Sequence, residues 1–175
     1  MVLFGPTGVG KTRILFDRFP QSSEIISADS MQVYRGMDVG TAKPSQQERR
    51  RLPHHLIDTH DISEQFHAGA FVTACDRLVP AIRDRGNLPV VAGGTAFYLR
   101  AYLFGLPGTP QTPMEIREQL KGELERCGLQ DLYNQLAAVD PKSADVIDPN
   151  DTYRVLRALE VYRTSGKPRS EYRVP

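Results

Sequence analysis

The sequence predicts an α/β fold, and three observations support it. Short apolar or β-branched runs alternate with helical runs in the first part of the chain, an order typical of parallel sheets. A glycine-rich phosphate-binding pattern, G-x-x-x-x-G-K-[ST], occupies Gly5–Thr12 between a strand and a helix. After the linker Gly105–Pro113 the sequence becomes entirely helical. These features predict a P-loop NTPase-like parallel-sheet core over residues 1–107 and an all-helical inserted lobe over residues 108–175.

In the first region, local patterns predict three strands and three helices. Strands are expected at Val2–Phe4, Glu24–Ala28 and Leu88–Ala92. Helices are expected at Arg13–Phe19, Phe71–Arg85 and Ala96–Phe104, with a kink at Pro80 and with Phe97 and Tyr98 in the core. Because parallel strands present their carboxyl ends at one edge of a sheet, the residues that follow the three strands are expected to meet. These residues are the phosphate-binding loop, Asp29-Ser30 and Gly93-Gly94-Thr95.

The second region is predicted to hold three helices. Thr112 is expected to cap the first, with Pro113 at the first helical position and Glu115 completing a capping box. That helix is expected to end near Gly128. The second is expected at Leu129–Val139, and the third from Asn150-Asp151 through Thr164 to Gly166.

The loop Gly5-Pro6-Thr7-Gly8-Val9-Gly10-Lys11-Thr12 fills every fixed position of the phosphate-binding pattern. Glycines let the backbone turn its N–H groups toward phosphate oxygens, and the following helix adds its positive N-terminal dipole. Lys11 supplies a positive charge, and the Thr12 hydroxyl is suited to ligate Mg²⁺. The sequence therefore predicts a bound di- or triphosphate, with Mg²⁺ as the cofactor.

Composition narrows the class of protein. The chain has 175 residues, of which 40% are hydrophobic and 25% charged, with a net charge of +1. It has no apolar stretch of bilayer length and no signal pattern, and its two cysteines are isolated, so a cytoplasmic protein without a membrane partner is expected. Residues 152–175 contain six basic and two acidic residues. That excess suits a polyanionic partner and equally a solvated helix face.

Several further segments give the chain a family resemblance. They are Ser27–Pro44, which contains Gly40-Thr41-Ala42-Lys43-Pro44, then Pro53–Asp58, Val91–Thr95 and Asp148–Lys167. Together with the phosphate-binding loop, these segments closely resemble the tRNA dimethylallyltransferase (tRNA isopentenyltransferase) family. The resemblance implies a transferase that moves a dimethylallyl group from its diphosphate to the exocyclic amino group of the adenosine 3′ of the anticodon. The family continues well past this point, so the chain is expected to lack a C-terminal part.

Asp29 is the candidate general base. An adenine amino group is a weak nucleophile, so a base that takes its proton accelerates attack by about 10²–10⁴-fold. By residue type alone, Asp29 suits Mg²⁺ binding or helix capping equally well, and the resemblance assigns it the role of base. The resemblance also implies catalytic roles for Lys11 and Thr95, with the loop holding the leaving diphosphate. The residues implied to contact tRNA are Asp29, Ser30, Met31, Gln32, Thr95, Arg117, Tyr153, Arg154, Val155, Leu156 and Arg157.

The sequence is also compatible with other classes of protein. An adenine-nucleotide prenyltransferase would use a free nucleotide as acceptor, and a P-loop small-molecule kinase would share the loop and the sheet. A non-catalytic RNA-binding fragment is a third possibility. The Gly40–Pro44 run and the helical lobe favour tRNA. The expected partners are therefore the anticodon loop of tRNA and dimethylallyl diphosphate, bound by a monomer.

Overall fold

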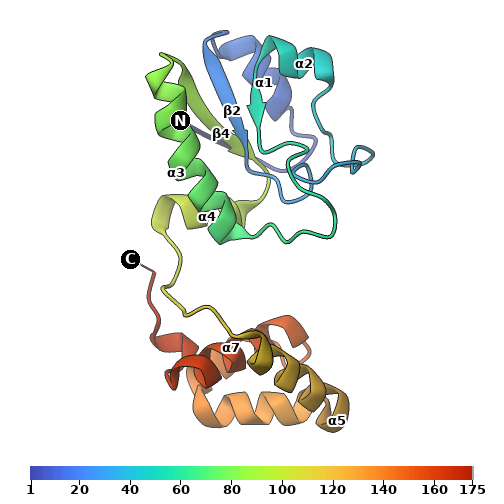
Figure 1. The fold of residues 1–175 in the computed structure, drawn as a ribbon, viewed down its shortest axis with the longest axis vertical. Helices are drawn as coiled ribbons and strands as arrows, with labels where there is room; N and C mark the ends of the chain where they lie inside the picture. The colour runs from blue at the N-terminus through green and yellow to red at the C-terminus, as the bar shows by residue number, and fades with distance from the viewer. Residues whose placement is uncertain (175) are drawn as a thin grey trace. The chain divides into compact units, whose positions relative to one another are not determined.

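The computed structural model describes residues 1–174, which form two compact units. The first unit is Met1–Leu106 and the second begins at Pro107 (Figure 1). Each unit has its own hydrophobic core, so each is described by itself.

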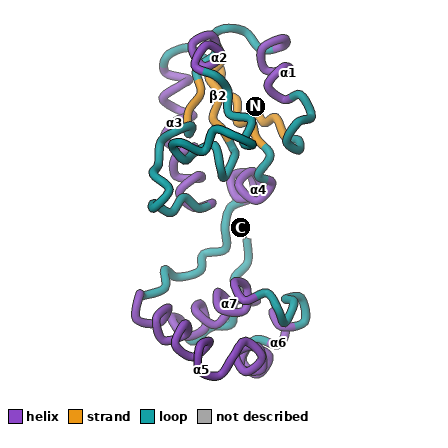
Figure 2. The backbone as a smooth tube through the Cα atoms, turned by 90° about the vertical axis from the view of Figure 1, so that its right-hand side faces the viewer, coloured by secondary structure: helices purple, strands orange, loops and turns teal. Residues whose placement is uncertain are grey.

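The first unit is built on a four-stranded parallel sheet. Its strands are β1 (Val2–Phe4), β2 (Ser23–Ser27), β3 (His54–His55) and β4 (Leu88–Gly93). The strand order is β1-β4-β2-β3, and every neighbouring pair is parallel. The strands are drawn in orange in Figure 2. The three strands expected from the sequence are confirmed. The strand β3 is not among the expected strands, because two histidines are too short a run to show a period.

Helices cover both faces of this sheet. They are α1 (Lys11–Arg18), α2 (Gln46–Arg51), α3 (Ala68–Asp84) and α4 (Ala96–Phe104). Neighbouring residues of a strand point to opposite faces. Accordingly, Ile26 packs in a core with α3 and α4, whereas Ile25 packs in another core with Leu15 of α1. The helix α3 continues through Pro80, which lies on its exposed side.

The core prediction for the two aromatics of α4 is correct for one of them. Tyr98 is buried and stacks on Phe71, with ring centroids 5.0 Å apart. Phe97 is 60% exposed, so placing it in the core was wrong. Adjacent residues of a helix point about 100° apart, and the face of α4 that packs against α3 takes Tyr98 and leaves Phe97 outside.

The second unit is helical, as predicted. It contains α5 (Met114–Val139), α6 (Pro141–Ala144), α7 (Thr152–Ser165) and the 3₁₀ turn η1 (Arg169–Glu171). The helix α5 is broken at Gly128, whose φ of 80° is left-handed, so the expected pair of helices is confirmed. The helix α7 ends at the left-handed Gly166, also as predicted. The core of this second unit includes Leu120, Leu132, Leu136, Val155 and Leu159.

The predicted capping box at the start of α5 is wrong. The N-cap is Pro113, and no side chain caps the helix. Thr112 is buried instead, and its hydroxyl donates to Glu160 (3.2 Å) and accepts from Arg157 (2.7 Å), both on α7. The threonine thus links the first residues of this unit to α7, a partner that a local pattern cannot show.

Glu24 is a buried carboxylate on β2 that is fully paired. It accepts hydrogen bonds from Arg85 (2.7 and 3.0 Å), Asn87 (2.8 Å) and His55 (2.6 Å). These bonds, that from Arg85 above all, lower the pKa of Glu24 to about 2. The carboxylate therefore ties β2 to the end of α3 and to β3.

Glu24→Gln is expected to lower the free energy of unfolding at pH 7 by about 2–3 kcal/mol. The pKa of Glu24 is lower in the folded state, so its contribution is present above its ordinary range and lost as pH falls toward 2. Denaturant unfolding between pH 7 and pH 3 checks this, with the exposed Asp76→Asn as control. A variant that matches the wild type at pH 7 would show that the network adds no net stability.

Candidate active site

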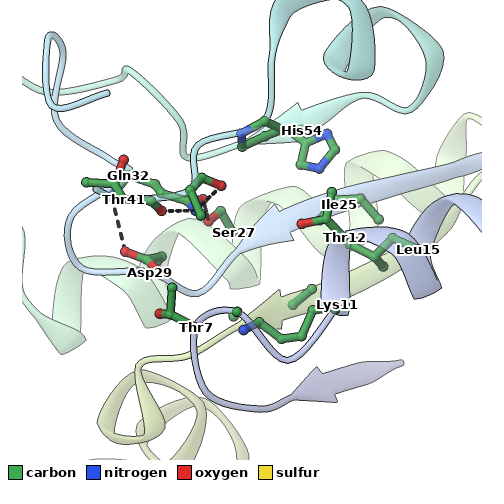
Figure 3. Close-up of a pocket in the computed structure, with 16 residues that line it drawn as sticks. Thr7, Lys11, Thr12, Leu15, Ile25, Ser27, Asp29, Gln32, Thr41 and His54 are labelled. Carbon is green, nitrogen blue, oxygen red and sulfur yellow. Dashed lines mark hydrogen bonds between the residues drawn. The ribbon is translucent and has the colours of Figure 1, made fainter. Parts of the chain in front are cut away.

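The candidate site is a cavity of about 220 Å³ at the carboxyl edge of the sheet (Figure 3). The phosphate-binding loop, the residues after β2 and the end of β4 all contribute to it, as the order of strands predicted. Its lining residues are Thr7, Gly8, Gly10, Lys11, Thr12, Leu15, Ile25, Ser27, Asp29, Gln32, Thr41, Ala42, Pro44, His54, Ala92 and Gly93.

The loop between β1 and α1 has the geometry that phosphate binding needs. Gly8 and Gly10 have φ values of 82° and 91°, a conformation that other residues rarely adopt. The helix α1 begins at Lys11, so its free N–H groups and positive dipole end lie at the cavity. Lys11 Nζ donates to the carbonyls of Gly5 (2.7 Å) and Pro6 (2.8 Å). An ammonium group has three protons, so these two bonds leave one for a ligand.

Asp29 lies at the cavity just beyond the end of β2 (Figure 3). Its Oδ1 accepts hydrogen bonds from the backbone N–H groups of Met31 (2.9 Å) and Gln32 (3.2 Å). Because both bonds go to Oδ1, Oδ2 keeps its lone pairs for another proton donor. The carboxylate is thus held in one orientation, with one oxygen fixed.

Thr95 joins the residues after β2 to the start of α4. Its Oγ1 accepts from the backbone N–H of Ser30 (3.0 Å) and donates to Ser30 Oγ (3.4 Å). The Thr95 N–H donates to Ala28 O (3.1 Å). The side chain makes no bond that caps α4, so its hydroxyl serves this cross-link.

Gln32 is held by the protein on both ends of its amide. Its Oε1 accepts from Ser27 Oγ (3.0 Å), and its Nε2 donates to the carbonyls of Thr41 (2.9 Å) and Ala42 (3.3 Å). In this arrangement Gln32 fixes a loop, rather than offering a free amide edge. Met31 is 44% exposed.

Several lining residues lie outside the set of site residues predicted from the sequence. The cavity takes apolar surface from Leu15, Ile25, Ala92 and Pro44. His54 and Thr12 line the same cavity (Figure 3). Burial lowers the pKa of His54, and its Nδ1 lies 2.6 Å from the Leu52 carbonyl. The Gly40–Pro44 run was a usable signal for the cavity wall. The sequence of a strand, by contrast, does not indicate which of its apolar residues line a cavity and which pack in the core.

The other residues implied to contact tRNA lie in the second unit. Tyr153 and Arg154 are exposed on α7, and Arg154 pairs with Asp151 (2.5 Å). Arg117 is exposed on α5, with its Nε 3.9 Å from Glu160. These three side chains are accessible to a ligand.

Three members of the same set have internal partners. Val155 is fully buried in the helical core, and Leu156 packs against that core. The structure thus gives the Val155 side chain a packing role, and its contact with tRNA stays a prediction. Arg157 donates to Thr112 (2.7 Å), Glu160 (2.8 Å) and Thr109 (3.3 Å), so its guanidinium is largely committed.

None of the helices in residues 1–174 is long and apolar enough to cross a bilayer.

A parallel sheet whose first strand enters a helix through a glycine-rich, lysine-bearing loop defines a P-loop α/β protein. Comparison with known proteins identifies the branch of that class. The model of the IPP transferase family matches residues 32–174, more than half of the chain. The chain belongs to the IPP transferase family.

Relatives and solved structures agree with this assignment. The chain is 44% identical to the tRNA dimethylallyltransferases of Halorhodospira halophila and Salinibacter ruber. Each match covers 98% of this chain, and they cover 56% of the Halorhodospira protein and 53% of the Salinibacter protein. The tRNA isopentenylpyrophosphate transferase structure from Bacillus halodurans is 41% identical over 95% of this chain and 56% of its own, with a TM-score of 0.57. The structure of a eukaryotic dimethylallyltransferase acting on tRNA is 36% identical to this chain. The match covers 99% of this chain and 44% of that structure's chain, with a TM-score of 0.75. The chain thus spans about half the length of the curated relatives it matches.

Proposed function

We propose that this chain carries the donor site and part of the acceptor site of a tRNA dimethylallyltransferase. The reaction transfers a dimethylallyl group from dimethylallyl diphosphate to the exocyclic amino group of the adenosine 3′ of the anticodon. The observation that carries the proposal is a single cavity shared by the phosphate-binding loop and a carboxylate, in a chain of the IPP transferase family. The proposed setting is the cytoplasm, with the protein acting as a monomer.

The chemistry follows from what lines the cavity. The amino nitrogen of adenine attacks the first carbon of the dimethylallyl group, and the bond from that carbon to the diphosphate oxygen breaks. Asp29 takes the proton that the nitrogen loses, on the oxygen not fixed by Met31 and Gln32. Lys11 and the N-terminus of α1 stabilise the negative charge that grows on the leaving diphosphate.

Thr12 is the residue that would hold Mg²⁺. It is the second residue of α1 and lies on the cavity, and a hydroxyl is a suitable oxygen ligand for this cation (Figure 3). No cluster of three carboxylates, histidines or cysteines suited to a metal occurs in residues 1–174. In proteins, Mg²⁺ is usually bound by one or two protein oxygens together with substrate phosphates and water. When bound, Mg²⁺ would neutralise charge on the leaving diphosphate.

The acceptor base is proposed to enter beside Ser30, Met31 and Thr95. Thr95 and Ser30 are cross-linked and partly accessible, and Met31 exposes an apolar side chain to a base that leaves its stack. Gln32 would contact the base only if its bonds to the loop open. The second unit is proposed as a tRNA-binding lobe inserted into the core, with Arg117, Tyr153 and Arg154 as its contacts.

A small-molecule kinase is the second candidate, because it would use the same loop and sheet. A kinase and a prenyltransferase differ in what they do with the bound phosphates. A kinase transfers a phosphoryl group, whereas a prenyltransferase releases an intact diphosphate.

The deciding experiment supplies labelled dimethylallyl diphosphate and Mg²⁺ with tRNA, AMP or ATP as acceptor. Label in tRNA alone supports the proposal, and label in AMP or ATP would assign the chain to the nucleotide prenyltransferases. Binding of the donor to the same sample is measured by calorimetry. Absence of donor binding would contradict the proposed donor site.

Lys11→Met is expected to weaken binding of dimethylallyl diphosphate by about 10- to 100-fold, because a charge-assisted bond to phosphate is lost. The same calorimetric titration measures it. Lys121→Met, an exposed lysine of the second unit, is the matched control and is expected to bind as the wild type does. Unchanged affinity in Lys11→Met would remove the lysine from the diphosphate site.

A further inference from the structure

The loop Gly36–Pro44 forms one wall of the cavity and is held there by side chains on two sides. Thr41, Ala42 and Pro44 line the cavity. Ala42 has a φ of 50°, a left-handed conformation that costs free energy for a residue other than glycine. A strained wall of this kind keeps its shape only while neighbouring groups hold it.

The first attachment comes from Gln32, which lines the cavity itself. As described above, its amide joins Ser27 of β2 to the carbonyls of Thr41 and Ala42. The wall is therefore fixed to the sheet through two of its own backbone oxygens.

The second attachment is Lys43, which does not line the cavity. Its side chain is 3% exposed, and its Nζ donates to Asp58 (2.6 Å), Asp38 (2.7 Å) and the Tyr34 carbonyl (2.9 Å). Burial would lower the pKa of Lys43, but its hydrogen bonds to the two aspartates outweigh burial and raise it. All three protons of the ammonium group are used within the protein.

Asp58 is in turn fixed to the surrounding chain. Arg49 Nη1 donates to its Oδ2 (2.7 Å), and Arg49 Nε donates to the Pro44 carbonyl (3.0 Å). The Asp58 N–H donates to Gln32 O (3.1 Å). One network thus connects both attachments of the wall.

We propose that Lys43 and Asp58 are positioning residues that hold the wall Gly36–Pro44 against the hydrocarbon of a prenyl diphosphate. Ala42 and Pro44 share the cavity with the apolar side chains of Leu15 and Ile25, whereas the phosphate-binding loop provides the charged part. Loosening the wall removes apolar contact and leaves the diphosphate contacts in place. This inference rests on the proposed function, because it takes the donor to be a prenyl diphosphate.

The test compares dimethylallyl diphosphate with inorganic diphosphate, each titrated with Mg²⁺ into the wild-type chain and its variants. Lys43→Met breaks the network, and Lys43→Met with Asp58→Asn also removes the carboxylate that loses its bond to Lys43. Asparagine tolerates the left-handed φ of 56° at position 58. The exposed Lys142→Met is the matched control, and circular dichroism verifies that every variant is folded.

Both network variants are expected to bind dimethylallyl diphosphate about tenfold more weakly, with inorganic diphosphate affected less than about twofold. An equal loss for both ligands, or a loss for neither, would overturn the positioning role. A wild-type chain that binds neither ligand would instead contradict the proposed donor site. The two failures are therefore distinguishable.

Discussion

Replacing Asp29 with asparagine is expected to slow dimethylallyl transfer by about 10²–10⁴-fold and to leave the affinity for dimethylallyl diphosphate unchanged. Asparagine keeps the Oδ1 acceptor that binds the N–H groups of Met31 and Gln32, so the turn after β2 is preserved. It replaces the oxygen that would take the proton with an NH₂ group, which cannot act as a base. Transfer of label to tRNA and calorimetric donor binding measure the two effects separately.

Asp29→Ala is the companion variant, because it removes the Oδ1 acceptor of the turn as well as the base. We expect it to lose transfer and also stability, whereas Asp29→Asn loses transfer alone. If Asp29→Asn loses donor binding in parallel with transfer, Asp29 acts through Mg²⁺ or through the structure of the site. Full transfer by Asp29→Asn would assign the base to another group.

Gly93→Ala is expected to lower the free energy of unfolding of the first unit by about 3 kcal/mol or more. A Cβ at Gly93 would lie 2.1 Å from Ala28 O and 2.4 Å from its carbonyl carbon. These are backbone atoms of the chain just beyond β2, so no side-chain rotation relieves the contact. The strand ends that carry Asp29 (after β2) and Thr95 (after β4) would have to separate. Thermal unfolding followed by circular dichroism measures the loss.

Gly94→Ala is the matched control one residue later. Its Cβ would meet Gly5 O at 3.4 Å, an ordinary van der Waals distance, so the fold is expected to persist. A Gly93→Ala protein as stable as Gly94→Ala would show that β2 and β4 can part without cost. It would also show that the close approach of Gly93 and Ala28 does not fix the edge of the sheet.

Much of the fold could be predicted because its signals are local. The bounds of β1 and α4 follow from runs of apolar residues beside turn residues, and Gly128 and Gly166 mark helix ends through their left-handed backbone. The parallel sheet followed from the alternation of strands and helices. From that order alone, Lys11 and Asp29 were expected at one edge, and both line the same cavity.

The errors concern residues whose partners are distant in the sequence. Thr112 has the local pattern of a cap, but it is bound by Arg157 and Glu160 on another helix. Phe97 belongs to an apolar run, yet only one face of α4 packs against α3, and that face takes Tyr98.

The sequence by itself determined that the chain carries the phosphate-binding pattern between a strand and a helix, that its core is a parallel sheet and that a helical region follows. Each of these depends on residues that are neighbours along the chain, where spacing alone sets the geometry. Only the tertiary structure decided which side chains are free to act. It places Lys43 in a buried network with Asp58, commits Gln32 to the cavity wall and buries Val155. The physical reason is that burial and hydrogen bonding depend on contacts between distant segments, which form only when the chain folds.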